Sequence, residues 1–151
     1  HYLSDKYIRV LKDGYVSMDV AQNILVVKTV SGMAMAVAAA IDAIKLKEIV
    51  GYLGEHFTEP LSLSAVAAEF GLSPQYFSPF FRDNFGRTFT QHINSLRIEQ
   101  AARLLRETDL PVMEVGFRVG FDNFSYFIKR FREVFNCTPS QYRLNFMRMN
   151  Q

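Results

Sequence analysis

Three polar side chains recur at helical spacing near the end of the chain. Ser125, Lys129 and Arg132 stand at positions i, i+4 and i+7, which places them on one face of a helix. Phe127 and Phe131 fall on another face, where they would pack into a core. Hydroxyl, ammonium and guanidinium groups donate hydrogen bonds to phosphate oxygens and to base edges. The pattern predicts either a helix that suits the major groove of DNA or an ordinary amphipathic surface helix.

A helix, a tight turn and a second helix must hold that polar face. Apolar residues at helical spacing predict the first helix within residues 112–119 and the second from residue 124 onward. Gly120 between them can adopt the positive φ that a sharp turn needs. Asp122 or Asn123 can accept hydrogen bonds from the free amides that open the second helix. The stretch is therefore predicted to form a helix-turn-helix unit.

The same arrangement occurs about fifty residues earlier. Placing Gly71 on Gly120 gives an offset of 49 residues, and placing Phe77 on Phe127 gives 50, so the second turn has one extra residue. A repeated unit favours a pair of helix-turn-helix motifs over an ordinary surface helix.

Caps and breakers predict the remaining helices of this region. Ser62 caps a helix that ends at Gly71, Ser73 and Pro74 begin one that ends at Gly86, and a last helix opens at residues 139–140. Thr88 caps a long helix that runs through residue 107 and rises about 27 Å. A spacer of that length can hold two recognition helices roughly one DNA turn, about 34 Å, apart.

The first 45 residues are predicted less sharply. Residues 7–11 suit a strand or the end of a helix, and residues 19–30 fit a helix better than a strand. Residues 31–41 predict a helix with an alanine and methionine face that packs on another domain or a second copy. The apolar run at 29–41 is shorter than the roughly 20 residues that a membrane helix needs, so we expect no membrane span. Residues 1–45 are interpreted as a homodimerisation arm or the remnant of a sensor domain.

Charge is distributed unevenly along the chain. Residues 1–70 carry six basic and eight acidic side chains, whereas residues 71–151 carry eleven basic and seven acidic ones. Ten of those eleven are arginines, which bind phosphate and guanine in bidentate fashion. An anionic partner is therefore expected for the second part. Cys137 is the single cysteine, which excludes an internal disulfide and suits a reducing cytoplasm.

The region from about Leu46 to Arg143 resembles the DNA-binding domain of the AraC/XylS family of transcription regulators. The motifs that carry the resemblance are VGFDNFSYFIKRFREVFNCTPSQYR, LSLSAVAAEFGLSPQYFSPFFRDNFG and LRIEQAARLL. The resemblance implies an all-α fold, in which seven helices form two helix-turn-helix subdomains joined by a long linker helix. A short, mostly helical arm would precede it. The predicted division is an arm at 1–41 and a DNA-binding domain at 42–151, with helix-turn-helix units at about 62–85 and 112–135 and a linker helix at about 88–107.

The resemblance also implies which residues meet DNA, with the two recognition helices in adjacent major grooves. The base-reading residues would be Gln75, Ser78, Phe124, Ser125, Tyr126 and Lys129. The phosphate-contacting residues would be Arg82, Arg87, Thr88, Arg130, Arg132, Thr138 and Ser140. The phenylalanines at 77, 81, 127, 131 and 135 are expected in the core.

Three residues depart from the family pattern. Pro79 replaces a common basic residue and predicts a kinked first recognition helix with weaker base reading. Gly116 replaces an alanine, at a cost of about 1 kcal/mol in helix propensity. Cys137 replaces a common glycine, and a positive φ there would be strained.

The predicted function is that of a bacterial, cytoplasmic, nucleoid-associated regulator that binds double-stranded DNA, activates transcription and touches RNA polymerase. No cofactor, metal site or catalytic residue is expected, since the histidines share no motif and His92 reads as a surface or boundary residue. An alkyl-accepting role for Cys137 would need a zinc-binding cysteine cluster that the sequence lacks. The alternative is a protein-interaction module that keeps the fold but has lost DNA binding, as Pro79 would allow.

Overall fold

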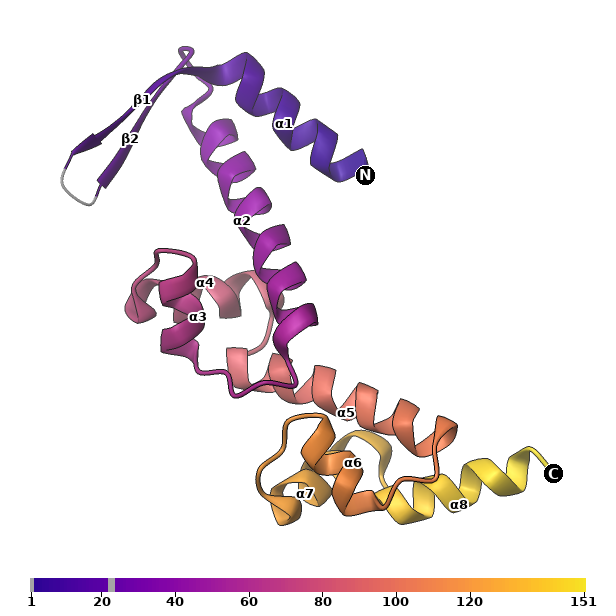
Figure 1. The fold of residues 1–151 in the computed structure, drawn as a ribbon. Coiled ribbons are helices and arrows are strands. Elements are labelled where there is room, and N and C mark those ends of the chain that lie inside the picture. The colour runs from indigo at the N-terminus through magenta and orange to yellow at the C-terminus, as the bar shows by residue number, and fades with distance from the viewer. Residues whose placement is uncertain (1, 22–23) are drawn as a thin grey trace. The chain divides into compact units, whose positions relative to one another are not determined.

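The computed structural model describes residues 2–21 and 24–151, which form eight helices and two strands (Figure 1). The chain divides into two compact units, His1–Tyr52 and Leu53–Gln151. We call them the N-terminal unit and the C-terminal unit. Helix α2 (Ala34–His56) begins in the first, and its last residues belong to the second.

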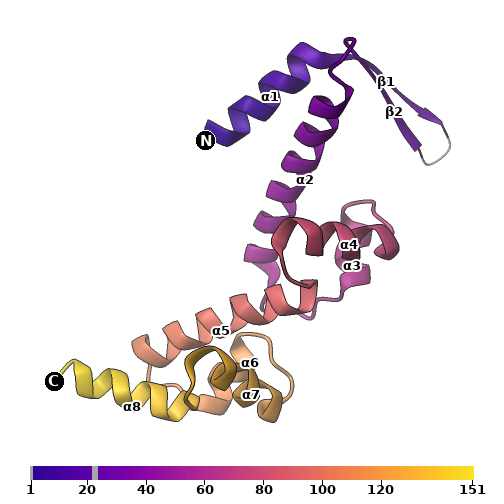
Figure 2. The same cartoon turned by 180° about the vertical axis from the view of Figure 1, so that it is seen from behind.

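The N-terminal unit contains helix α1 (Tyr2–Gly14), strands β1 (Tyr15–Ala21) and β2 (Ile24–Thr29), and most of α2. The strands pair antiparallel, with Met18 opposite Val27, and form the ribbon seen in Figure 2. Residues 7–11 are helical. The helix predicted for residues 19–30 is wrong in the described part of that range, because the β-branched run of β2 pairs with β1 in extended conformation.

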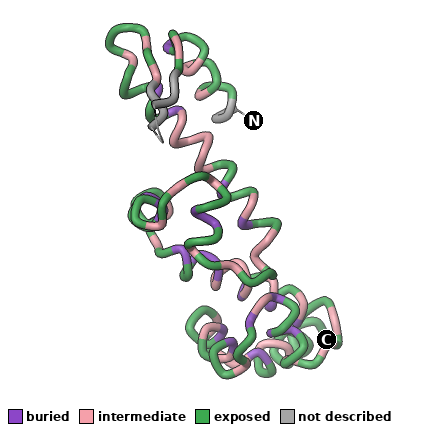
Figure 3. Tube along the Cα trace, turned by 60° about the vertical axis from the view of Figure 1, so that its left-hand side comes forward, coloured by how far each residue is buried: buried purple, intermediate pink, exposed green. Residues whose placement is uncertain are grey.

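Little of the N-terminal unit is buried, as the tube in Figure 3 shows. Its buried apolar side chains among the described residues are Val37, Ala40 and Ile49. Val16, Met18 and Met35 are exposed. Gly14 allows a close approach of the chain to α2, because a Cβ there would lie 2.7 Å from Val37 Cγ2. A two-stranded ribbon with so small a core is marginally stable by itself.

The C-terminal unit is helical throughout, which confirms the predicted all-α fold. Its helices after α2 are α3 (Leu63–Glu69), α4 (Pro74–Phe85), α5 (Phe89–Glu107), α6 (Val112–Arg118), α7 (Phe124–Phe135) and α8 (Pro139–Met149). Side chains act as N-caps of five of these helices. The predicted caps Ser62, Ser73, Thr88 and Asn123 are confirmed, and Thr138 is a fifth cap that was not predicted from the sequence. Gly71 and Gly120 both adopt positive φ, 65° and 108°, in the turns.

Aromatic packing repeats between the two helix-turn-helix units. Phe81 on α4 packs edge-on against His92 on α5, and Phe131 on α7 packs edge-on against Tyr142 on α8, with ring centroids 5.4 Å apart in both. Phe77, Phe81, Phe127 and Phe131 are fully buried as predicted, and Phe135 is half-buried. Helices α4 and α7, the two predicted recognition helices, are therefore each held by the helix that follows them.

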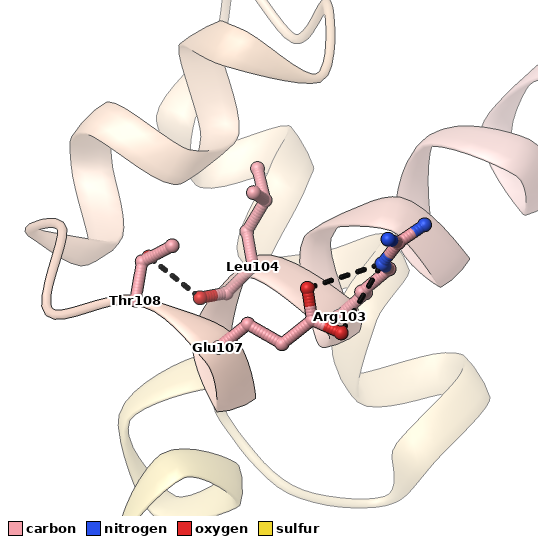
Figure 4. Close-up of polar contacts among 4 residues, drawn as sticks. All are labelled: Arg103, Leu104, Glu107 and Thr108. Carbon is pink, nitrogen blue, oxygen red and sulfur yellow. Dashed lines mark hydrogen bonds and ion pairs between the residues drawn. The ribbon is translucent and has the colours of Figure 1, made fainter.

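The end of α5 is closed by polar contacts (Figure 4). The hydroxyl of Thr108 donates to the carbonyl of Leu104 over 2.7 Å, and Arg103 Nε donates to the carboxylate of Glu107. Arg143 on α8 donates from Nε to the carbonyl of Leu105 over 3.1 Å. Thr108 and Arg143 thus satisfy two of the carbonyls that a helix end leaves free.

The structure shows the surroundings of the three residues that depart from the family pattern, Pro79, Gly116 and Cys137. Gly116 is buried where α6 meets α7, and a Cβ there would lie 2.8 Å from Phe127 Cδ1. The positive φ after α7 falls on Asn136, at 57°, and not on Cys137, so the strain foreseen at the cysteine does not arise. Helix α4 continues from Pro74 through Pro79 to Phe85.

None of the helices in the described ranges is long and apolar enough to cross a membrane.

Removing a buried aromatic ring should destabilise the protein far more than removing an exposed one. Phe131→Ala should lower the free energy of unfolding by about 3–5 kcal/mol, since it leaves a cavity among buried rings. Phe117→Ala removes the same atoms from a residue that is 51% exposed and should cost much less. Urea unfolding followed by circular dichroism measures both. Equal losses in the two variants would contradict the assigned core.

Candidate nucleic-acid interface

Helix α7 presents the polar face predicted from the sequence. The side chain of Asn123 accepts a hydrogen bond from the amide of Tyr126 over 2.9 Å and so begins the helix. Ser125, Lys129 and Arg132 are all exposed and line one shallow groove. In the part of the chain that the structure describes, Lys129 and Arg132 form no ion pair. These donors are available to a ligand.

Helix α4 presents a less charged face. Gln75, Ser78 and Arg82 are exposed, as base reading and phosphate binding would require. Pro79 is also exposed and occupies the position that Lys129 has in α7, given the offset of 50 residues. The outer face of α4 therefore offers one cation, Arg82, where that of α7 offers two, Lys129 and Arg132.

The first turns of α5 and α8 share one capping arrangement. The amide of Gln91 donates to the hydroxyl of Thr88 over 3.2 Å, and the amide of Thr88 donates to the side chain of Gln91 over 2.9 Å. Thr138 and Gln141 repeat these bonds at 3.2 and 2.9 Å. The box leaves the amide of Ser140 in the first turn of α8 for an anion, because Pro139 has none. Both threonine hydroxyls still have a proton to donate.

Arg87, one of the predicted phosphate contacts, is oriented by a histidine. Its Nε donates to His92 Nδ1 over 3.2 Å. His92 is buried, 8% exposed, and its ring lies 5.4 Å from that of Phe81 and 5.3 Å from that of Phe85. The interpretation of His92 as a surface or boundary residue is therefore wrong. Burial, and secondly the charge of Arg87, lower the pKa of His92. A neutral imidazole accepts the bond from Arg87.

Two other predicted contact residues have partners within the protein. Tyr126 Oη accepts a hydrogen bond from Asn94 Nδ2 on α5 over 2.7 Å. The guanidinium of Arg130 lies 5.1 Å from the centre of the Tyr126 ring, and its Nη1 is 2.9 Å from a carboxylate oxygen of Glu133. Arg130 Nε is buried without a hydrogen-bond partner. Tyr126 therefore links α7 to α5, whereas the contacts of Arg130 stay within α7. Phe124 is half-buried, 6.3 Å from the Phe127 ring.

Arg97 is a polar residue whose role the sequence did not indicate. It stands in the middle of α5 and donates from Nε to the carbonyl of Phe57 over 2.7 Å and from Nη2 to the carbonyl of Glu59 over 2.9 Å. Burial lowers the pKa of Arg97, and Asp122 and Tyr126 oppose this shift. The sequence indicated only that Arg97 lies in the long helix. Its partners could not be foreseen, because they are backbone carbonyls about 40 residues away.

No three histidine, cysteine, aspartate or glutamate side chains in the described ranges lie close enough to hold a metal ion.

Comparison with known proteins gives two separate matches along the chain. A family model described as a helix-turn-helix domain matches residues 66–145, and one described as the C-terminal domain of the arginine repressor matches residues 11–56. The chain is 35% identical over 99 residues to the HTH-type transcriptional activator RhaS of Salmonella schwarzengrund, which covers 66% of this chain and 36% of RhaS. It is 71% identical over 49 residues to the arginine repressor of Lachnoclostridium phytofermentans, which covers 32% of each.

A solved structure shares the helical fold. The DNA-binding domain of the transcriptional factor AdpA, in complex with a target DNA, superposes with a TM-score of 0.65 at 31% identity, covering 68% of this chain and 92% of that domain. The chain spans about a third of the length of the curated relatives it matches.

The burial of a neutral histidine makes stability depend on pH. Below about pH 6.5 the unfolded chain binds a proton at residue 92 that the folded chain resists. The free energy of unfolding should therefore fall as pH decreases from 7, by at most about 1.4 kcal/mol per pH unit for this one group. His92→Tyr, which copies the ring of Tyr142, should flatten this pH dependence. Urea titrations between pH 5 and 8 measure it, and equal slopes in wild type and His92→Tyr would refute the role.

Proposed function

Because the chain belongs to the AraC/XylS family of transcription regulators, which are not enzymes, we propose that it binds specific sequences of double-stranded DNA and regulates transcription. The observation that carries this proposal is the exposed face of α7. Ser125, Lys129 and Arg132 have no side-chain partner there within the described part of the chain, and buried phenylalanines line the opposite side of the helix. A rigid helix with free donors on one side is what reading a major groove requires.

The proposed mechanism assigns bases and phosphates to different side chains. Base edges are read by Gln75, Ser78, Phe124, Ser125, Tyr126 and Lys129. Phosphates are held by Arg82, Arg87, Thr88, Arg130, Arg132, Thr138 and Ser140, which fix the position of the protein on the duplex. Support comes from the free amide in the first turn of α8 and from the exposure of Arg82 and Arg132.

Both recognition helices take part in the proposed complex, in adjacent major grooves. The matched caps, turns and aromatic contacts of the two units support this arrangement. Helix α7 contributes more to specificity, because Pro79 of α4 replaces a cation with a side chain that has no donor. The name of RhaS supports activation as the direction of regulation, and contact with RNA polymerase and a place in the nucleoid follow from that role.

Residues 42–151 form the DNA-binding part in this proposal, and the preceding arm joins two copies of the chain. The N-terminal unit supports dimerisation because an apolar cleft lies open between its elements, lined by Leu11, Lys12, Tyr15, Met18, Val27 and Ile41. Arginine is disfavoured as the occupant of this cleft, because a guanidinium needs carboxylates and Lys12 is the one charged side chain among the described residues that line it. A second copy of an apolar surface suits the cleft better.

Selection of bound sequences from a random duplex library, at low and at moderate salt, tests the DNA-binding proposal. A two-block motif about one helical turn apart is expected. Lys129→Ala should change the preferred base at one position, by about 1–3 kcal/mol of discrimination. Arg132→Ala should weaken binding to all sequences and reduce the salt slope by about 1.

Arg103→Ala is the matched control, because Arg103 already pairs with Glu107 and loses the same charge without touching the α7 face. Absence of enrichment at either salt would contradict DNA binding and favour the protein-interaction module, which the exposed Pro79 allows. Equal effects of all three variants would contradict the assigned roles on α7.

Sedimentation equilibrium tests the dimer. Met18→Glu places a charge in the apolar cleft and should weaken self-association at least about tenfold, because a carboxylate loses its hydration when it is buried against apolar side chains. Met149→Glu, at an 85% exposed position of α8, should leave it unchanged. A wild-type chain that sediments as a monomer at micromolar concentration would contradict the dimer.

A further inference from the structure

Arg97 joins three segments of the C-terminal unit that are far apart in the sequence. The side chain rises from the middle of α5 and donates to the carbonyls of Phe57 and Glu59, in the segment that leads from α2 into α3. Its guanidinium carbon lies 5.8 Å from the centre of the Phe121 ring, in the turn between α6 and α7. One planar cation therefore touches the entrance of the first helix-turn-helix unit and the turn of the second.

The backbone of the turn in the second unit lies directly against the guanidinium of Arg97. Gly120 has a φ of 108°, and a Cβ there would lie 2.7 Å from Arg97 Nε and 2.9 Å from the carbonyl oxygen of Thr58. A positive φ favours glycine in any turn. The lack of space for a Cβ, by contrast, is specific to the contact with Arg97 and Thr58. Asp122, beside it, favours the charged form of the guanidinium. Pro60, Leu61 and Ser62 border the same small hollow as Arg97, Gly120 and Asp122.

A hydrogen bond from Asn94, on the same face of α5 as Arg97, also holds α7. Asn94 stands three residues before Arg97, one turn along α5, and donates to Tyr126 Oη over 2.7 Å. Residues 120–122 lead directly into Asn123, the cap of α7, and Tyr126 lies in its first turn. The position of α7 thus depends on contacts from α5 and on the chain that enters the first unit.

We propose that Arg97 is a positioning residue that sets the orientation of the two recognition helices to each other, and with it the spacing between the two DNA blocks that the protein accepts. The guanidinium itself is occupied by backbone carbonyls and does not contact DNA. The spacing role rests on the proposed function, whereas the orientation role does not.

The physical reason lies in the coupling of two binding events. When one recognition helix is bound, the second binds with an effective concentration that depends on how rigidly it is held at the matching distance. A planar donor with two carbonyl acceptors and an aromatic face restricts that distance more than a single flexible ammonium would. Loosening the joint should lower affinity at the best spacing and raise tolerance of other spacings.

Binding of the full chain to duplexes with the two selected blocks 9 to 13 base pairs apart, and to duplexes with one block, measures this coupling. Arg97→Ala should weaken binding at the best spacing by at least about tenfold while changing one-block binding less than about twofold. Arg97→Lys should recover part of the loss, since it keeps the charge and one donor direction. Arg103→Ala, on the same helix, is the control. An equal loss on all duplexes, or none on any, would overturn the spacing role.

Distances between spin labels test the orientation role without DNA. The labels are attached to the variants Asp83→Cys on α4 and Val134→Cys on α7. Both positions are exposed, and Cys137→Ser removes the native thiol. We expect one narrow distance distribution in wild type and a broader one in Arg97→Ala at unchanged helix content. Gly120→Ala should broaden it as well, because the added methyl group displaces the guanidinium.

The two experiments distinguish failure of the inference from failure of the proposed function. An unchanged narrow distribution in Arg97→Ala would overturn the inference even if the protein binds DNA. A broadened distribution in a protein that selects no DNA sequence would keep Arg97 as the orienting residue and overturn the regulator proposal and the spacing role with it.

Discussion

The C-terminal unit depends on one packing constraint, in which a buried phenylalanine of α4 and one of α7 each pack against a ring of the following helix. Phe81 meets His92 and Phe131 meets Tyr142 at the same separation. Because these rings occupy one side of α4 and α7, the polar residues of each helix must point outward. The exposed faces are therefore a consequence of how the core packs. The turn glycines, Gly71 and Gly120, allow the sharp turns that place the helices against this core.

The same constraint supports different chemistry in the two units. The second unit has Tyr142 at this place, whose hydroxyl accepts a hydrogen bond from Arg106 Nη1 over 2.6 Å. The first unit has His92 there, whose neutral form accepts a bond from Arg87. Pro79 and Lys129 give a parallel contrast on the outer faces. The second unit is thus the more highly charged on its outer face, and the first is the more sensitive to acid.

The N-terminal unit has a different origin of stability. Its similarity to the arginine repressor C-terminal domain covers residues 11–56 and ends before the helix-turn-helix match begins at residue 66. Val37, Ala40 and Ile49 form a small buried set, while Met18 and Tyr15 border an open apolar cleft. A unit that leaves so much apolar surface exposed gains stability when a partner covers it.

The sequence by itself determined the helices of the C-terminal unit, because their signals are local. Ser62, Ser73, Thr88 and Pro139 act within one turn of their own position, and the phenylalanine spacing repeats with the helix. The ribbon of β1 and β2 escaped prediction because the apolar run at residues 24–27 suits a buried helix or a strand until a partner strand is known. Tertiary structure alone decided the roles of Arg97, His92 and Gly116. Their partners lie on other elements, and only folding reveals which backbone carbonyl, ring or cation lies within contact distance of each.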